Sequence, residues 1–120
     1  MAADVLILID QQKAMAHPKW GPRNNPDAER NIARLLAAWR ERGWPIIHVR
    51  HDSTYPDSPF RPGQEGNDFL PLTAPRPGET VVVKRVTSAF IDTDLNSPTF
   101  GQVTGVRPMR RIQITTRFRF

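Results

Sequence analysis

The chain has no cysteine among its 120 residues. This absence excludes disulfides, thiolate metal sites and any cysteine nucleophile supplied by these residues. Long apolar runs are also missing: the longest, Val5 to Ile9, is far shorter than the roughly 20 residues needed to cross a bilayer. The amino terminus lacks the basic start and small-residue cleavage site of a secretory signal. We therefore expect a cytoplasmic protein without a membrane partner.

Acidic residues are absent after Asp94, which changes how the net charge is interpreted. The formal charge is +5, a value that suggests nucleic-acid binding when the charge is evenly distributed. Residues 1–106 are electrically balanced, however, and arginines in residues 107–120 supply the whole excess. We expect one domain over 1–106 and then a basic tail or the remnant of a fourth strand. The tail alone, with Phe118 and Phe120 as stacking platforms, is thin support for nucleic acid as a partner.

The first 50 residues have the pattern of a strand, a helix and a second strand. Residues 5–9 are continuously aliphatic, as expected of a parallel strand buried on both faces. Residues 26–42 have helical periodicity, with Asn25 as the expected cap and Gly43 as the stop. Residues 45–50 are again extended and apolar. A right-handed crossover would place the two strands parallel.

The remaining chain adds a long connection and further strands. Residues 51–78 are rich in Pro, Gly, Ser and Asp, which is typical of a functional or lid-like loop. Residues 81–83 form a predicted third strand, residues 87–95 have the pattern of a short helix, and the alternation in 111–115 indicates a fourth strand. We predict a three-layer, Rossmann-like α/β domain with a mostly parallel, incomplete sheet.

Two charged residues follow predicted strands. Asp10 directly follows the first strand and Lys84 directly follows the third. Open α/β sheets bind their ligands at the carboxyl ends of parallel strands. We therefore expect Asp10 and Lys84 at neighbouring strand ends, either as parts of a site or as a plain ion pair.

Five stretches of the chain match a known family in order and spacing. They are residues 6–12 (LILIDQQ), 31–36 (NIARLL), 47–53 (IHVRHDS), 58–63 (SPFRPG) and 83–95 (VKRVTSAFIDTDL). Together they resemble the isochorismatase-like cysteine hydrolase superfamily, which includes nicotinamidases and many other amidohydrolases. The resemblance implies hydrolysis of a C–N bond in a small amide-type substrate, without a cofactor.

The resemblance also implies which residues act. In that family a cysteine thiolate attacks the amide carbonyl, and water hydrolyses the resulting acyl-enzyme. Asp10 matches the residue that takes the thiol proton and later returns a proton to the leaving group. Lys84 matches the lysine that pairs with this carboxylate and favours the thiolate. Asp10 and Lys84 are therefore the predicted catalytic residues.

Four further residues are predicted to bind the substrate: Gln12, His51, Phe60 and Phe90. Phe60 and Phe90, like Trp20, are aromatic candidates for a pocket wall, with core or loop packing as the alternative. His51 is expected to shape the mouth of the pocket or to accept a hydrogen bond from the loop.

A metal site of the nicotinamidase type is not predicted. That branch binds its metal through an Asp and two His, and its first His lies two residues after the Asp. Here Thr54 occupies that place after Asp52, and no His follows it anywhere in the chain.

The chain departs from the family pattern after Leu95. Family members continue with a helix, a fourth strand and a Gly-rich turn that bears the cysteine. Residues 96–101 break the helical pattern, and two accounts of the segment after them stay open. Residues 105–106 and 111–115 echo the family's loop and fourth strand, or the tail is out of frame with its ancestor. Thr115 and Thr116 are poor replacements for the cysteine because a hydroxyl needs a dedicated base.

Two functions are compatible with these residues. The first is a family hydrolase of small amides that is inactive as written, because the nucleophile is absent. The second is a non-catalytic remnant or interaction module with the same fold. Six strands are usual for the family, so the chain should leave a strand edge uncovered, and such edges favour pairing with another copy. We therefore also predict a homo-oligomer.

Overall fold

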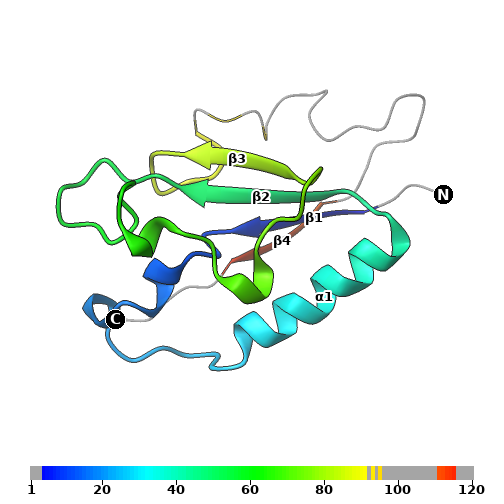
Figure 1. Cartoon of the computed structure of the whole chain (residues 1–120), viewed down its shortest axis with the longest axis horizontal. Coiled ribbons are helices and arrows are strands. Elements are labelled where there is room, and N and C mark those ends of the chain that lie inside the picture. The colour runs from blue at the N-terminus through cyan, green and yellow to red at the C-terminus, as the bar shows by residue number, and fades with distance from the viewer. Residues whose placement is uncertain (1–3, 92, 94, 96–110, 116–120) are drawn as a thin grey trace.

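The computed structural model describes residues 4–91, 93 and 95, and the backbone of 111–115. Its main elements are β1 (Val5–Ile9), α1 (Ala28–Arg42), β2 (Ile46–His51), β3 (Thr80–Lys84) and β4 (Arg111–Thr115) (Figure 1). Four short 3-10 helices lie in the connections: η1 (Lys13–Ala16), η2 (Pro18–Trp20), η3 (Glu65–Asn67) and η4 (Pro71–Thr73). The predictions for residues 96–110 and 116–120 lie outside the described residues.

The strands form one sheet in the order β3-β2-β1-β4. Every pair is parallel: Ile7 lies opposite Ile47, and Val49 lies opposite Val82. On its other side Ile7 lies opposite Gln113, so β4 pairs with β1 over its whole length. The α/β fold with a parallel sheet and the fourth strand at 111–115 are thereby confirmed. All four strands end at the same edge of the sheet, which is where Asp10 and Lys84 lie.

Helix α1 covers one face of this sheet. Its buried residues Ile32, Leu36 and Trp39 pack against Leu6, Leu8 and Ile46. These positions recur at helical spacing on α1, which is why its apolar stripe faces the sheet. The helix ends at Gly43, whose left-handed backbone (φ 66°) confirms the predicted stop.

The predicted start of this helix is wrong by two residues. The helix begins at Ala28, and Asp27 occupies the cap position without a side-chain capping bond. Asn25 has a positive φ of 53°, and its carbonyl accepts a hydrogen bond from the Ala28 N–H. Pro26 and Asp27 therefore form a turn that leads into the helix, instead of its first two residues.

The opposite face of the sheet is covered by residues that follow β3. Val5, Ile7 and Val49 pack there with Ala89 and Leu95. The described residues from 87 to 91 form bends and a turn and no helix, so the prediction of a helix at 87–95 is not met there. The Ser88 hydroxyl accepts the Phe90 N–H, a local bond that competes with helical pairing.

The connection between β2 and β3 is fastened to the rest of the domain. Phe60 packs with Ala14, Met15 and the partly buried Trp20 beneath it. Gly66 lies so close to Pro59 that an added Cβ would overlap the Pro59 carbonyl oxygen. The loop that the sequence marks as lid-like is therefore packed closely at its centre.

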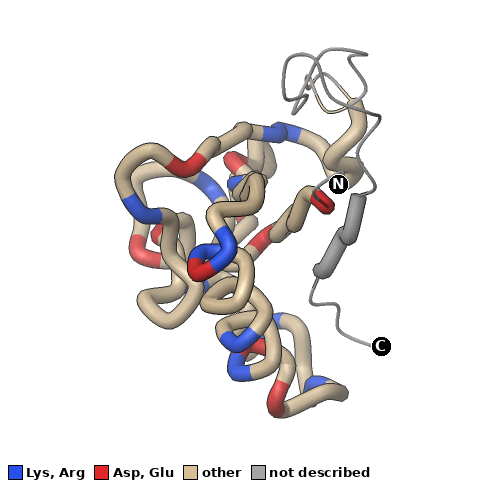
Figure 2. The backbone as a smooth tube through the Cα atoms, turned by 90° about the vertical axis from the view of Figure 1, so that its right-hand side faces the viewer, with Lys and Arg blue, Asp and Glu red and all other residues tan. Residues whose placement is uncertain are grey.

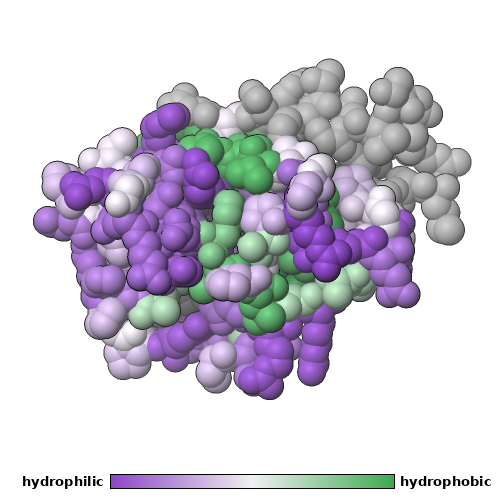
Figure 3. Space-filling view, in the orientation of Figure 1, coloured by the Kyte–Doolittle hydropathy of each residue, from purple (hydrophilic) through white to green (hydrophobic). Residues whose placement is uncertain are grey.

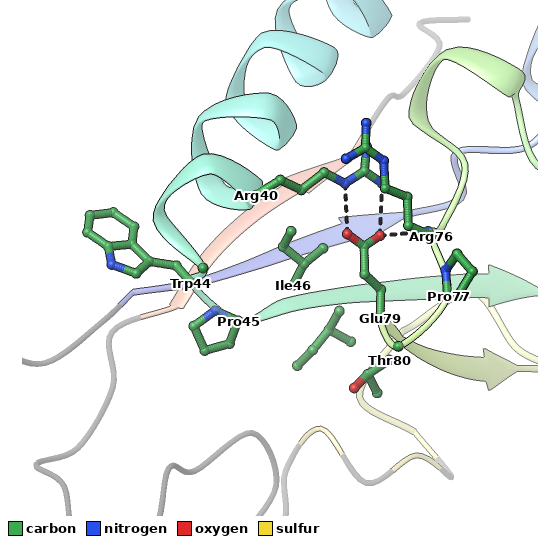
Figure 4. Close-up of a pocket in the computed structure, with 11 residues that line it drawn as sticks. Arg40, Trp44, Pro45, Ile46, Arg76, Pro77, Glu79 and Thr80 are labelled. Atoms are coloured by element: carbon green, nitrogen blue, oxygen red, sulfur yellow. Dashed lines mark hydrogen bonds and ion pairs between the residues drawn. The ribbon is translucent and has the colours of Figure 1, made fainter.

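A buried polar network lies at the amino ends of β2 and β3. Glu79 accepts hydrogen bonds from Arg40 Nε and Nη2 at 2.7 and 2.8 Å, from His48 Nε2 at 2.9 Å and from the Arg76 N–H at 2.9 Å. Hydrogen bonding to Arg40 lowers the pKa of Glu79 to about 2. Burial lowers the pKa of His48, whose neutral Nε2–H therefore donates to the carboxylate. The network ties α1 to the sheet and borders the cavity of about 460 Å³ in Figure 4.

Charge is mixed over the surface, and exposed apolar residues lie at several places on it. Figure 2 shows acidic and basic residues interspersed along the loops and α1. Figure 3 shows apolar side chains gathered over β3, where Val81 is 41% exposed. Within the described part of the chain, no helix combines the length and apolarity that a membrane crossing requires.

Candidate active site

Asp10 and Lys84 meet at the carboxyl edge of the sheet. The Lys84 Nζ lies 3.2 Å from each oxygen of the Asp10 carboxylate, and its bond to Oδ2 has hydrogen-bond geometry. Lys84 Nζ also donates to the Thr87 carbonyl at 2.7 Å. The lysine side chain is only 2% exposed, so both contacts lie out of solvent. The predicted pairing of these two residues is thus present in the structure.

The sequence predicted Asp10 and Lys84 at the ends of neighbouring strands, and this prediction is wrong. β2 lies between β1 and β3, so the ion pair spans the end of a strand that contributes neither residue. Asp10 adopts a left-handed backbone (φ 61°) while its N–H still bonds the Val49 carbonyl at 3.0 Å. Such a conformation costs on the order of 1 kcal/mol outside glycine, although aspartate tolerates it better than most residues. The turn lets the carboxylate reach across β2.

The Asp10 carboxylate contacts the Lys84 ammonium through both of its oxygens. Its side chain is 18% exposed, and its Oδ1 accepts no hydrogen bond from the residues that the structure describes. A partly buried carboxylate at this edge of the sheet can take a proton from a bound group and return it.

His51 is a third ionisable group beside this pair. It ends β2, and its ring stacks on Phe60 with 5.1 Å between the ring centroids and 28° between the planes. Burial lowers the pKa of His51; the charges of Asp10 and Asp52 raise it, and that of Lys84 lowers it. At neutral pH the site therefore presents a neutral imidazole next to the ion pair.

Gln12 holds the backbone of His51. Its Oε1 accepts the His51 N–H at 2.8 Å, and its Nε2 donates to the His51 carbonyl at 3.0 Å and to the Asn67 carbonyl at 2.8 Å. The residue is fully buried. Its contacts are thus with main-chain atoms, and direct binding of substrate by Gln12 stays a prediction.

The aromatic candidates lie in different places. Phe60 is 6% exposed and contacts both His51 and Trp20, whose ring centroid is 6.2 Å away. Phe90 packs against the apolar cluster on the sheet face opposite α1. Phe60 therefore contacts His51, which lies beside the ion pair, and does not itself contact the pair. Phe90 lies on the segment that follows Lys84. Their roles in binding substrate stay predictions.

Sequence reasoning missed Asn67. Its Nδ2 donates to the His51 carbonyl at 3.2 Å, to Asp52 Oδ1 at 2.9 Å and to the Phe60 carbonyl at 2.8 Å. Burial alone would raise the pKa of Asp52, but the hydrogen bonds from Asn67 and Arg50 lower it. Nothing local in the sequence distinguishes this asparagine from the other polar residues of the loop.

The described residues also contain no cluster of three His, Asp or Glu side chains able to hold a metal ion. The site's described groups are thus a carboxylate, an ammonium and an imidazole, which suit proton transfer and the binding of a small polar molecule.

Comparison with known proteins identifies the family of this chain. The model of the isochorismatase domain matches residues 4–97. The chain belongs to the isochorismatase family. The family resemblance expected from the sequence is thereby confirmed, and the matched segment contains Asp10, Lys84 and the loop between β2 and β3.

Individual relatives agree with this family. The isochorismatase family protein YrdC of Bacillus subtilis is 40% identical over 118 residues, which cover 93% of this chain and 63% of the relative. A crystal structure described as a hydrolase of the isochorismatase family, from Chromobacterium violaceum, has a TM-score of 0.73 and 57% identity, covering 78% of this chain and 48% of that one. An isochorismatase from Pseudomonas putida has a TM-score of 0.65 and 39% identity, covering 79% and 50%.

Each match covers a larger share of this chain than of the protein it is compared with. The chain spans between 48% and 63% of the length of the curated relatives it matches. The match to the Bacillus protein covers 93% of this chain and so includes part of the segment after Leu95. The match of the family model ends at residue 97, so both accounts of the segment after Leu95 stay predictions.

Proposed function

We propose that the chain is an isochorismatase-family hydrolase of the small-amide type whose 120 residues hold the base and its cation but not the nucleophile. The observation that carries the proposal is the contact between Lys84 Nζ and the Asp10 carboxylate, 3.2 Å long, at the carboxyl edge of the sheet. This edge is where open α/β sheets bind their ligands. Because the chain has no thiol, it has no covalent turnover of its own.

In this proposal Asp10 is the proton carrier. With a thiol supplied from outside these 120 residues, its carboxylate would take the thiol proton and return it to the nitrogen of the leaving amine as the C–N bond breaks. Lys84 contacts this carboxylate at 3.2 Å and would add positive charge where such a nucleophile becomes anionic. The Thr87 carbonyl holds the ammonium in place, 2.7 Å from Nζ. Each group thus has one chemical task.

The substrate is a small molecule that lies beside His51. The neutral imidazole can donate or accept a hydrogen bond, and Phe60 stacks against it. Phe90 supplies an apolar wall from the segment after Lys84. These groups suit a compact amide better than an extended polymer, because they lie close together at the ends of the three adjacent strands β1, β2 and β3.

A panel of small amides, together with isochorismate, tests this proposal. We expect no turnover by the chain and saturable binding of one or more amides, detected by shifts in the NMR signals of His51. Asp10→Ala should abolish that binding response. Saturable binding that survives both Asp10→Ala and Lys84→Met would contradict the site assignment. Turnover abolished by Asp10→Ala would contradict the inactivity and retain the site, because protonation by the aspartate can cleave a vinyl ether without a cysteine.

The second candidate is a non-catalytic remnant or interaction module. The 2% exposure of Lys84, together with its bonds to Asp10 and Thr87, also suits an ion pair that only joins β1 to β3. Silence across the panel in both turnover and binding supports this second candidate.

A further inference from the structure

The Gln12 side chain behaves like a strand residue paired with His51. Its amide exchanges two hydrogen bonds with the His51 main chain, N–H to Oε1 at 2.8 Å and Nε2 to carbonyl at 3.0 Å. The second Nε2 hydrogen donates to the Asn67 carbonyl at 2.8 Å. Both amide hydrogens are thus used, and the side chain is fully buried. A buried, fully engaged amide of this kind holds one geometry.

The loop between His51 and Asn67 is closed by the same contacts. Asn67 Nδ2 shares the His51 carbonyl with Gln12 and also bonds the Phe60 carbonyl. The main chain repeats the link beside it, since Gln12 forms an antiparallel bridge with Phe69. The start, the middle and the end of the loop are thus joined to the segment that follows Asp10.

The His51 ring is the group whose position these contacts decide. Its backbone is held by Gln12, and its ring is held by stacking on Phe60. The charged groups that act on it are Asp10, Lys84 and Asp52. A shift in the His51 backbone would therefore change the distance between the imidazole and the ion pair.

We propose that Gln12 is a positioning residue that acts through His51, fixing the imidazole beside the Asp10–Lys84 pair. It touches the main chain of His51 and leaves contact with the substrate to the ring. The functional role of this imidazole position rests on the proposed function. The positioning itself holds whether or not the chain turns over a substrate. Its consequence is that loss of the Gln12 amide changes His51 selectively.

An NMR titration of the three imidazoles in the full chain tests the proposal. In the unaltered chain His51 should titrate below its ordinary pKa, because the ring is buried beside the ion pair. In Gln12→Ala the ring gains solvent, so its pKa should rise toward the ordinary value. Gln12→Met keeps most of the side-chain volume and removes the amide. It should give the same rise in the His51 pKa, and it replaces the alanine variant if that variant does not fold.

Two controls separate positioning from general structural loss. His48 lies in the same strand but pairs with Glu79, so its titration should stay unchanged in the Gln12 variants. Gln64→Ala removes an exposed amide that bonds the Ser58 carbonyl in the same loop and should leave His51 unchanged. An unchanged His51 titration in Gln12→Met, or equal movement of His48 and His51, would overturn the proposal. Neither outcome bears on whether amides bind, so failure of the two proposals can be told apart.

Discussion

The Asp10 carboxylate contacts the Lys84 ammonium across the end of β2, a strand to which neither residue belongs. The 3.2 Å separation depends on the left-handed turn at Asp10 and on the length of the lysine side chain. The contact joins β1 to β3, which do not pair with each other. One ion pair therefore serves both as a clamp across the sheet and as the chemical centre of the proposed site.

Replacing Lys84 by methionine should strongly destabilise the fold. The change removes the cation but keeps most of the side-chain length, leaving a largely buried carboxylate without its partner. Removal of one member of a buried pair costs about 3 kcal/mol or more, and the 18% exposure of the Asp10 side chain places the expected loss near 2–3 kcal/mol. Urea unfolding measures the change.

Two further variants test whether the ion pair accounts for this loss of stability. The double variant Asp10→Asn, Lys84→Met should recover much of the loss, because no charge is then left buried. Lys13→Met removes an exposed ion pair with Glu65 and should cost less than about 1 kcal/mol. If the double variant is no more stable than the single one, the ion pair does not account for the effect.

Acid should destabilise the domain in two steps. Burial lowers the pKa of His48 and of His51, so the unfolded chain binds these protons first and stability falls below about pH 6.5. The pKa of Glu79 is about 2 in the fold and about 4.5 otherwise, so its contribution is present above pH 4.5 and is lost as pH falls toward 2. Urea unfolding at a series of pH values records both steps.

Glu79→Gln separates the contribution of Glu79 to the second step from that of Asp52, whose pKa is also lowered. It removes the charge that Arg40 and His48 contact, so we expect a loss of about 2 kcal/mol at pH 7 and a smaller loss near pH 2. A variant whose stability deficit is the same at both pH values would show that Glu79 does not titrate as described.

Alanine at position 66 should disturb the loop that carries Phe60. The added Cβ would overlap the Pro59 carbonyl oxygen, which is backbone and cannot move without its neighbours. We expect a loss of about 2 kcal/mol in the free energy of unfolding, together with a shift in the His51 NMR signal, because Phe60 stacks on that ring. Native stability in Gly66→Ala would show that the close approach is not required.

The outer edge of β3 should mediate self-association. This strand lies at one end of the described sheet, and Val81 on it is 41% exposed. Unpaired strand edges favour pairing with another chain, and a lysine there opposes it. We expect light scattering to show oligomers that Val81→Lys reduces.

Tyr55→Lys is the matched control for the edge. It removes a large apolar residue that is 73% exposed in the loop and should leave the oligomeric state unchanged. A monodisperse monomer for the unaltered chain would contradict the prediction.

Local patterns were sufficient for most of the elements. The aliphatic run predicted β1, Gly43 predicted the end of α1, and the alternation at 111–115 predicted β4. Such signals depend on residues a few positions apart, so they can be found without knowing the fold. They were insufficient where local hydrogen bonds compete with a helix, through the main-chain carbonyl at Asn25 and the side-chain hydroxyl at Ser88.

The sequence by itself determined the family, the parallel α/β class and the two charged residues of the candidate site. Only the tertiary structure decided that β2 lies between Asp10 and Lys84, that Gln12 and Asn67 hold His51, and that Glu79 joins Arg40 to His48. Gln12 and His51 are 39 positions apart in the chain. A contact at that separation depends on how the strands are ordered and packed, and no local pattern of residues encodes it.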